Sequence, residues 1–275
     1  MSELERALRE LTRPKRQVYD KKTVLRAPFS YPGSKMPLLN TLGRILPYKR
    51  CWVEVFGGSI VVTLNRTPSL VEVVNDTHSG IVALYRCLRD PVLLERLNDW
   101  INLTVNSYED WLSYKEHWRD ASDPVERAGR WLYVITYSFS ALGRNWGFSP
   151  DLRLSGRLIE RTECFKHIHQ RLRNVTIENN DWRTLLHRYD QGSTVFYLDP
   201  PYLDTQQQAL EYGSTMAYAE HEEMLDTIAN MVGFVAVSGY ANHLYDRQKF
   251  WTARNTVDIR GLGNKQNEEV IWIKS

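Results

Sequence analysis

The sequence predicts an α/β fold, in which the strands of a parallel sheet alternate with helices. Three observations predict it. Residues 51–56 form an apolar run of strand length that leads through a Gly-rich turn into a helical pattern over residues 60–65. Residues 71–76 repeat the strand pattern and end in a carboxylate. Residues 195–198 form a third apolar run, which stops at Asp199-Pro200-Pro201-Tyr202 because two prolines cannot continue a strand. A strand, a helix and a second strand in succession are typical of a Rossmann-like βαβ unit.

The composition is that of a soluble globular protein. The 275 residues are 43% hydrophobic and 25% charged, and no apolar run approaches the roughly 20 residues that cross a bilayer. The charged N-terminus does not resemble a secretory signal, so we expect a cytoplasmic protein. The net charge of +2 neither requires nor excludes nucleic acid. Three distant cysteines, Cys51, Cys87 and Cys164, predict neither disulfides nor a metal site.

The rest of the chain continues the alternation of helices and strands. A helix over residues 38–46 ends at Pro47, and the aromatic residues of the helical stretch 125–142, Phe139 included, are expected on a buried face. Further helices are expected over residues 81–118, 165–173, 184–189 and 221–231, and further strands over residues 175–178, 234–240 and 269–274.

The stretch Asp199-Pro200-Pro201-Tyr202 has the chemistry of a pocket for an aromatic amine. Asp199 is a hydrogen-bond acceptor, and Pro200 has no N–H and offers only its carbonyl oxygen. Two neighbouring acceptors suit an exocyclic amino group, and the ring of Tyr202 gives a planar base a face to stack on. Adenine or cytosine fits this description. The alternative is an ordinary strand end, in which Asp199 caps the next helix.

A second set of residues has the layout of a nucleoside site. Gly57 and Gly58 let the backbone approach a ligand, and Asp76, which lies 22 positions after Glu54, ends the next strand and can accept the ribose hydroxyls. The alternative is a plain turn between a strand and a helix. The segment 29–35 is a turn with a lysine at its end, but it lacks the Walker spacing, so nucleotide triphosphate hydrolysis is not supported.

The loop 143–150 opens the one stretch with a convincing surface for a polyanion. Basic side chains here outnumber acidic ones and alternate with aromatic residues. Arginines can contact base edges and phosphates, Asn145 can contact an adenine edge, and Phe148 can enter between stacked bases. The candidate DNA-binding residues are Arg144, Asn145, Phe148, Arg153 and Arg157. The alternative is a solvated basic surface. The basic arm 1–26 is a weaker candidate for phosphate contact.

In combination these motifs resemble the Dam-like D12 class, the alpha group of S-adenosylmethionine-dependent DNA adenine N6-methyltransferases. The resemblance covers most of residues 28–275 and is most specific at residues 199–202. It implies a Rossmann-like class I methyltransferase sheet with a mostly helical inserted domain. The implied parts are an N-terminal basic arm (1–26), a catalytic methyltransferase domain (27–104 and 166–275) and an inserted target-recognition domain (105–165).

The resemblance also implies roles for individual residues. Glu54 lies near the amino group of the cofactor's methionine part, with Phe56 packing beside it. Asp76 binds the ribose. Asp181 and Trp182 correspond to an Asp-aromatic pair beside the cofactor adenine, although Asp181 is equally placed to cap the next helix. The implied cofactor-binding residues are Tyr31, Pro32, Gly33, Lys35, Glu54, Phe56, Gly57, Gly58, Asp76, Asp181, Trp182 and Asp199. Two positions depart from the pattern: Ser34 replaces a usual glycine before the lysine, and Ile60 stands where many relatives have a further glycine.

The implied reaction is direct methyl transfer from S-adenosylmethionine to the N6 of an adenine flipped out of duplex DNA, with S-adenosylhomocysteine as product. The catalytic residues are Asp199, Pro200, Pro201 and Tyr202. No cysteine follows a proline, so methylation of a cytosine ring carbon is not expected. Methylation of cytosine N4 or RNA adenine, and a silent DNA-binding module, remain alternatives. The expected partner is double-stranded DNA, without membrane or obligatory protein partner, for a monomer in a bacterial or phage-infected cell.

Overall fold

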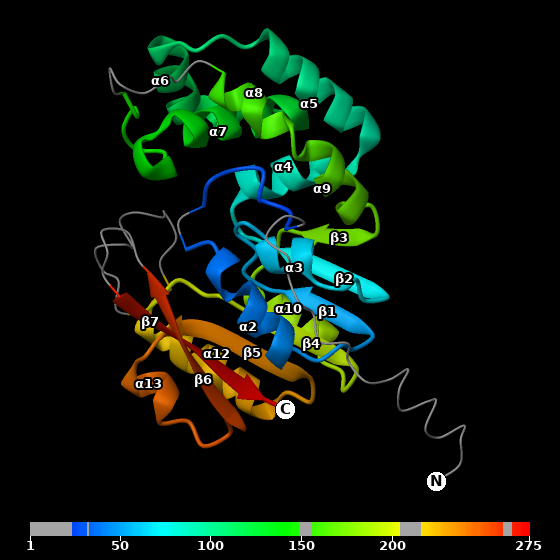
Figure 1. Cartoon of the computed structure of the whole chain (residues 1–275), viewed down its shortest axis with the longest axis vertical. Coiled ribbons are helices and arrows are strands. Elements are labelled where there is room, and N and C mark those ends of the chain that lie inside the picture. Colours follow the sequence, from blue (N-terminus) through cyan, green and yellow to red (C-terminus); the bar gives the residue numbers. More distant parts are fainter. Residues whose placement is uncertain (1–23, 32, 149–155, 204–215, 261–265) are drawn as a thin grey trace.

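The predicted α/β fold is confirmed by the computed structural model, which describes residues 24–31, 33–148, 156–203, 216–260 and 266–275. Within these residues one seven-stranded sheet has the order β3-β2-β1-β4-β5-β7-β6 (Figure 1). Strands β1 to β5 are parallel, and β7 is antiparallel to its neighbours β5 and β6. The strands are β1 (Cys51–Glu54), β2 (Val71–Asn75), β3 (Val175–Glu178), β4 (Thr194–Leu198), β5 (Phe234–Tyr240), β6 (Ala253–Arg260) and β7 (Gln266–Lys274).

Strand β6 was not expected from the sequence. It lies at the edge of the sheet beside β7, and its polar side chains at Arg254 and Thr256 are exposed. An edge strand needs no apolar run, because one side of it is not covered by another strand and solvent reaches its side chains. Its sequence therefore lacks the hydrophobic signal that identified the central strands.

Two layers of helices cover the parallel strands. The short helices α2 (Leu39–Ile45) and α3 (Val61–Asn65), with the 3-10 turn η1 (Met36–Leu38), lie on one face of the sheet. The helices α10 (Trp182–Tyr189) and α12 (Tyr218–Asn230) lie on the other face, and α13 (His243–Asp246) follows β5. Successive side chains of β4 point to opposite faces of the sheet. Tyr197 packs with α2 and α3, whereas Phe196 packs with α10 and α12. The central strands are therefore buried on both sides.

A helical lobe stands above the β3 end of the sheet in Figure 1. Its helices are α4 (Ser79–Arg89), α5 (Pro91–Leu103), α6 (Tyr108–His117), α7 (Pro124–Tyr137), α8 (Arg157–Thr162) and α9 (Phe165–Leu172), with short 3-10 turns η2 (Trp118–Asp120) and η3 (Phe139–Ala141). The helical pattern over residues 81–118 is thus divided into three helices. Asp90 ends the first and caps the second, because its carboxylate accepts hydrogen bonds from the N–H groups of Val92 and Leu93.

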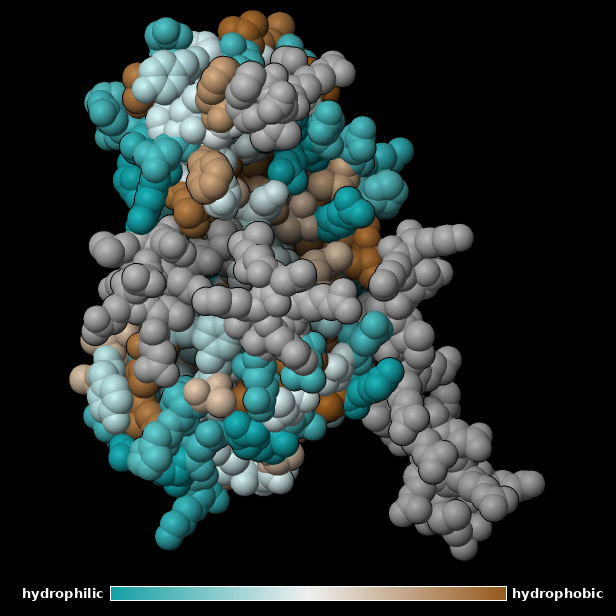
Figure 2. Space-filling model, turned by 60° about the vertical axis from the view of Figure 1, so that its left-hand side comes forward, coloured by the Kyte–Doolittle hydropathy of each residue, from teal (hydrophilic) through white to brown (hydrophobic). Residues whose placement is uncertain are grey.

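The hydrophobic core of this lobe continues into the sheet. One cluster of buried side chains runs from Ile60 and Val74, beside the sheet, to Leu97 on α5 and Trp131 on α7. This cluster contains residues from both sides of the predicted domain boundary at 104/105. The cluster therefore does not mark a boundary there, and the boundary stays a prediction. Figure 2 shows hydrophobic, brown side chains where the helical lobe faces the sheet lobe, and hydrophilic, teal side chains over much of the outer surface.

A buried ion cluster also joins the lobe to the sheet. Glu72 on β2, 3% exposed, accepts two hydrogen bonds of 2.6 and 2.9 Å from the Arg171 guanidinium on α9. Arg66, also buried, donates to the same carboxylate at 2.9 Å. The forked Arg171 guanidinium fixes α9 against the sheet, and Arg66 adds a third hydrogen bond to the same carboxylate. No helix in the described ranges has the length and apolar character needed to cross a membrane.

Candidate active site

The candidate site lies at the carboxyl ends of the central parallel strands. Strand order reverses between β1 and β4, since β2 and β3 continue to one side of this pair and β5 to the other. Ligands of open α/β sheets bind in the crevice outside such a switch point. Glu54 ends β1, Asp76 follows β2 and Asp199 follows β4, so three predicted site residues reach this same edge.

The Gly-rich turn after β1 needs both of its glycines. The N–H of Gly57 donates to the Asn75 carbonyl at 2.7 Å, and a Cβ at Gly57 would lie 2.8 Å from that oxygen. Gly58 has a φ of +48°, and a Cβ there would lie 2.7 Å from the ring of Tyr31. A side chain at Gly57 would collide with β2, and one at Gly58 would collide with the ring of Tyr31. The backbone of the turn therefore passes close to the ring of Tyr31 and to β2.

Ile60, which follows this turn, has an unusual backbone conformation. Its φ is +43° and its ψ is 23°, which places a β-branched residue in the left-handed region. A glycine would adopt this conformation without steric cost, and glycine is the residue that the family resemblance suggests here. The Ile60 side chain is 1% exposed and belongs to the core between sheet and helices, so its burial offsets the backbone strain.

Asp76 holds the Gly-rich turn in place. Its carboxylate accepts hydrogen bonds from the N–H of Gly58 at 2.8 Å and the N–H of His78 at 2.7 Å. Burial raises the pKa of Asp76, and these two bonds act in the opposite direction. The carboxylate that follows β2 therefore contacts the turn that follows β1, the neighbouring strand of the sheet. The ribose contact itself stays a prediction.

Asn75 is a positioning residue that the sequence interpretation missed. Its side-chain amide donates to the carbonyls of Val55 at 2.9 Å and Asn180 at 3.0 Å, and its oxygen accepts the N–H of Asn180 at 2.8 Å. These bonds join the ends of β1, β2 and β3. Asn75 reads as the last residue of an apolar strand, so only its tertiary contacts reveal this role.

Glu54 is a buried carboxyl group at the end of β1. It is 3% exposed and accepts hydrogen bonds from the N–H of Thr63, at 3.0 Å, and from the Thr63 hydroxyl. Burial raises the pKa of Glu54 to about 8, although the bonds from Thr63 lower it. At neutral pH the group is therefore mostly protonated in the described structure, and a cationic ligand beside it would favour its ionised form.

Lys35 and Asp199 form an ion pair in the centre of the site. The Lys35 ammonium lies 2.7 Å from Asp199 and 3.3 Å from Glu269, and it donates to the Gly33 carbonyl at 2.8 Å. Burial lowers the pKa of Lys35, but the two carboxylates outweigh it and the pKa is raised. The lysine therefore stays charged. Gly33, with a φ of +79°, makes the turn that brings its carbonyl to the ammonium.

Two hydroxyl groups lie beside the Asp199 carboxylate, and one of them, that of Ser238, donates to it. Ser238 on β5 donates to its Oδ1 atom at 3.0 Å, and the hydroxyls of Ser238 and Tyr197 lie 2.9 Å apart. The Tyr202 hydroxyl lies 3.3 Å from the same Oδ1 and donates a short bond to Glu269. The single proton of the Tyr202 hydroxyl is used in its bond to Glu269, so Lys35 and Ser238 are the donors to Asp199 among these residues. An ionised carboxylate accepts about four hydrogen bonds, so these two donors do not exhaust its capacity.

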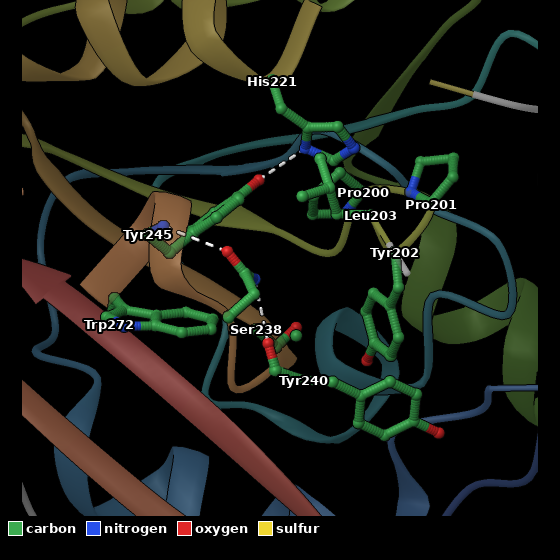
Figure 3. Close-up of a pocket in the computed structure, with 11 residues that line it drawn as sticks. Pro200, Pro201, Tyr202, Leu203, His221, Ser238, Tyr240, Tyr245 and Trp272 are labelled. Carbon is green, nitrogen blue, oxygen red and sulfur yellow. Dashed lines mark hydrogen bonds between the residues drawn. The ribbon is translucent and has the colours of Figure 1, made fainter. Parts of the chain in front are cut away.

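A small pocket opens beside the Asp-Pro-Pro-Tyr stretch (Figure 3). Pro200, Pro201 and Tyr202 form one side of it, and the ring of Tyr240 meets the ring of Tyr202 edge to face at a centroid distance of 4.6 Å. His221, from α12, also lines the pocket. Its Nδ1 lies 2.7 Å from the Tyr245 hydroxyl, and burial lowers the pKa of His221 to about 4, so it is neutral at pH 7.

Asp181 and Trp182 occupy the start of α10. Asp181 caps this helix, since its carboxylate accepts the N–H of Arg183 at 2.9 Å and pairs with the Arg183 guanidinium at 3.2 Å. Trp182 is 4% exposed and packs in the core between the sheet and α12. Its indole N–H is buried and has no hydrogen-bond partner among the described residues. The expected contact of this pair with a cofactor adenine stays a prediction. Phe56 is half-buried beside the same core.

Three of the predicted DNA-binding residues, Arg144, Asn145 and Phe148, lie on or directly after a hairpin-like loop that follows α7. Ser138 and Trp146 form an antiparallel bridge, and the N–H of Phe139 donates to the Asn145 carbonyl at 2.8 Å. Arg144 and Asn145 are exposed at the end of this hairpin, and Phe148 follows it with 72% of its surface exposed. Trp146 packs back onto Trp111 and Tyr137. Arg157 begins α8 nearby in the sequence.

The expectation that Phe139 is buried is wrong. Phe139 is 67% exposed, because α7 ends at Tyr137 and the chain then turns through positive φ angles at Ser140 and Ala141. Helical periodicity therefore stops two residues before Phe139. The hairpin region after α7 therefore carries two exposed aromatic rings, Phe139 and Phe148, together with the exposed Arg144.

Two predicted residues, Pro32 and Arg153, lie outside the described residues, as does most of the basic arm 1–26. Several site residues were missed: Thr63, Asn75, Ser238, Tyr240 and Glu269. The signal available in the sequence was a polar residue at the carboxyl end of an apolar strand, which holds for Asn75 and Ser238. In the described parts of the chain, no three His, Cys, Asp or Glu side chains are arranged to hold a metal ion.

Comparison with known proteins agrees with this geometry. A family profile described as D12 class N6 adenine-specific DNA methyltransferase matches residues 31–252. The DNA adenine methylases of Escherichia coli K12 and Salmonella typhimurium LT2 are each 28% identical over 183 residues, which are 64% of this chain and 65% of theirs. The DNA adenine methylase of Serratia marcescens is 26% identical over 183 residues, 64% of this chain and 67% of its own.

The match spans just under two thirds of the length of the Escherichia coli and Salmonella relatives. The family profile, in contrast, covers most of this chain, from the turn at Tyr31 to the start of β6, and includes the Gly-rich turn and residues 199–202. The seven-stranded sheet is consistent with the Rossmann-like methyltransferase fold of this family. The chain belongs to the family of D12 class N6 adenine-specific DNA methyltransferases.

Proposed function

We propose that this protein transfers a methyl group from S-adenosylmethionine to the exocyclic N6 of an adenine in double-stranded DNA. The observation that carries the proposal is the position of Asp199. Its carboxylate, oriented by Lys35 and Ser238, stands at the switch point of the sheet beside the ring of Tyr202. This is an acceptor next to a stacking face, which an adenine amino group requires.

The residues at and around the Gly-rich turn fit the proposed cofactor. The turn at Gly57 and Gly58 has no room for a Cβ and holds its backbone close to Tyr31 and β2, and Asp76 accepts the N–H of Gly58. Glu54 is a buried, mostly protonated carboxyl group that can pair with an ammonium group by losing its proton. Trp182 has a buried indole N–H without a described partner. When bound, S-adenosylmethionine supplies an electrophilic methyl group on a sulfonium sulfur.

The small pocket beside residues 199–202 supports the proposed binding of the base. Tyr202 and Tyr240 offer aromatic surface, and stacking on it offsets the few kcal/mol that removing a base from the duplex costs. Asp199 and the Pro200 carbonyl accept the two amino hydrogens, which keeps the nitrogen lone pair out of the ring and directed at the methyl group. The nitrogen gains the methyl group and releases one proton. Positioning of this kind accounts for most of the acceleration.

The hairpin after α7 supports a contact with duplex DNA. Arg144 is exposed and suits phosphates or a guanine edge, while Phe139 and Phe148 are exposed aromatic rings of the type that enter between base pairs. A DNA substrate places the reaction in the cytoplasm of a bacterium or a phage-infected cell. We further propose a monomer that acts without an obligatory protein partner.

The experiment that tests this function is methylation by the purified chain. Unmethylated duplex DNA is incubated with S-adenosylmethionine, digested to nucleosides and examined by mass spectrometry. We expect N6-methyladenine, no N4-methylcytosine, and much less product on RNA of the same sequence. Asp199→Ala should lose at least 100-fold in rate because it removes the amino-group acceptor, whereas Asp226→Ala, an exposed position on α12, should not change it.

The contrary outcomes are distinct. Methylated cytosine or RNA would move the substrate to another class. Cofactor binding without incorporation into any duplex would identify a silent DNA-binding module. A rate within tenfold of wild type for Asp199→Ala would remove this residue from the reaction.

A further inference from the structure

Glu269 is a buried carboxylate inside the candidate site, and it comes from β7, beyond the region that the family profile matches. It is 3% exposed and lies 3.3 Å from the Lys35 ammonium. It also accepts a short hydrogen bond from the Tyr202 hydroxyl. A buried carboxylate is costly unless it is paired and hydrogen-bonded, so both contacts are needed to keep it there.

Lys35, Asp199, Glu269 and Tyr202 form a closed arrangement. The three donors of the ammonium meet three oxygens, on Asp199, Glu269 and the Gly33 carbonyl. The Tyr202 hydroxyl lies between the two carboxylates, and the ammonium lies 5.2 Å from the centre of the Tyr202 ring. Moving Glu269 would therefore move both the lysine that orients Asp199 and the ring on which a base would stack.

The charges of this arrangement do not cancel. One ammonium faces two carboxyl groups, so acidic groups outnumber basic ones in this largely buried cluster. Burial raises the pKa of Glu269, as does Asp199, while Lys35 lowers it. Glu54 does not add to the negative charge at neutral pH, since the pKa of Glu54 is about 8. Buried charge of one sign favours a ligand of the opposite sign, because screening by water is weak there.

We propose that Glu269 is the positioning residue that gives this site its negative charge, and that this charge makes the site prefer the cationic methyl donor over the neutral product. The inference rests on the proposed function, since it assumes that the site beside Asp199 receives the sulfonium group of S-adenosylmethionine. S-adenosylhomocysteine has the same shape apart from the methyl group and lacks the positive charge. Product release is then favoured by the same carboxylate that holds Tyr202.

The test measures binding rather than turnover. Dissociation constants for S-adenosylmethionine and S-adenosylhomocysteine are measured by calorimetry, without DNA, for wild type and Glu269→Gln. We expect the donor-to-product affinity ratio to fall about tenfold in Glu269→Gln, because the charge is removed while an oxygen acceptor remains. Glu269→Asp, which keeps the charge, should retain most of the ratio. Glu268→Gln is the matched control, since Glu268 is the preceding residue on the same strand and its side chain is exposed.

A purely structural role gives a different result. It predicts that affinities for both ligands fall together in Glu269→Gln, with an unchanged ratio. A ratio within twofold of wild type in Glu269→Gln, or an equal loss in Glu269→Asp, overturns the proposal. If Glu269→Gln does not fold cooperatively, Glu269→Met replaces it, with the same fall in ratio expected. Failure of the wild-type chain to bind either ligand contradicts the proposed function itself, and this inference falls with it.

Discussion

At the scale of single residues, the site concentrates buried ionisable groups that are held in unequal protonation states. Glu54 is mostly protonated at neutral pH because burial raises its pKa to about 8. Lys35 remains charged because Asp199 and Glu269 raise its pKa against the effect of burial. Such divergence between neighbouring groups is typical of functional sites. It also makes the stability of the protein depend on pH.

Ionisation of Glu54 should lower the free energy of unfolding of the chain as the pH rises. Its folded pKa of about 8 exceeds its ordinary value of 4.5. Between these values the folded state holds a proton that the unfolded state releases, so increasing pH favours unfolding. Glu54→Gln removes this dependence while keeping an acceptor for Thr63. Relative to wild type, the variant should gain stability between pH 5 and pH 8.5, by at most about 5 kcal/mol at ~1.4 kcal/mol per pKa unit.

Urea unfolding of the ligand-free chain at both pH values measures this difference. Glu95→Gln, at an exposed position on α5, is the control and should follow the wild type at both. A stability difference between Glu54→Gln and wild type that does not change with pH would mean that Glu54 is already ionised in the folded chain.

At the scale of elements, the Gly-rich turn and the hairpin are the two features that present backbone and side chains to ligands. The turn is fixed by Asn75 and Asp76 from the next strand, so it is rigid. The hairpin is held at its base by the pairing of Ser138 with Trp146, and it leaves Arg144 exposed. Each makes a separate prediction.

Gly58→Ala should weaken cofactor binding at least tenfold. The new Cβ would lie 2.7 Å from the ring of Tyr31, and the φ of +48° disfavours any side chain. The fold should lose about 1 to 3 kcal/mol of stability from the strained backbone. Gly192→Ala is the matched control, because a Cβ there meets no atom within 4 Å. Calorimetric titration with S-adenosylmethionine and urea unfolding check both effects. Equal affinities of the two variants would exclude the turn from the cofactor site.

Arg144→Ala should weaken duplex binding and reduce its salt dependence. If the guanidinium contacts a phosphate, its loss lowers the slope of log affinity against log salt by about one. Arg44→Ala, an exposed arginine on α2 in the sheet lobe, should leave the slope unchanged. Fluorescence anisotropy with a labelled duplex at several salt concentrations gives the slope. If Arg144→Ala leaves both affinity and slope unchanged, the hairpin does not carry the proposed contact.

At the scale of the whole molecule, the helical lobe and the sheet share one hydrophobic core and a buried ion cluster. Their hydrophobic core is continuous from Val74 to Trp131, and Glu72 joins the two parts through Arg171. Unfolding one part would expose the core of the other. We therefore expect a single cooperative transition for the wild-type chain.

Glu72→Gln should lower the stability of the whole molecule by about 3 to 5 kcal/mol, since it leaves the Arg66 and Arg171 guanidiniums largely buried without their charged partner. The loss should be seen as a lower midpoint of the same transition, followed by both circular dichroism and tryptophan fluorescence in urea. Glu95→Gln again serves as the exposed control. Two separate transitions in the wild type would show that the helical lobe folds independently.

The sequence alone determined the parts of the fold that depend on local patterns. The strand 234–240 is found at its predicted bounds, because a strand buried on both faces is a continuous apolar run. The edge strand 175–178 is also found at its predicted bounds, and its buried residues alternate with more exposed ones. The Gly-rich turn and the Asp-Pro-Pro-Tyr stretch were identified for a similar reason, since glycine and proline restrict the backbone wherever they stand. The pattern failed where a polar edge strand, β6, has no such run, and where Phe139 follows an undetected helix end.

Only the tertiary structure decided which charged groups meet in the site. Lys35 precedes the first helix, Asp199 follows β4 and Glu269 lies on β7, so more than 60 residues separate each from the next. They come together because β7 pairs antiparallel with β5, which carries Glu269 to the edge where β4 ends. Strand pairing depends on contacts between distant residues, and no local pattern of amino acids records it. The sequence therefore indicated the acceptor and the stacking ring, and the fold supplied the ion cluster that holds them.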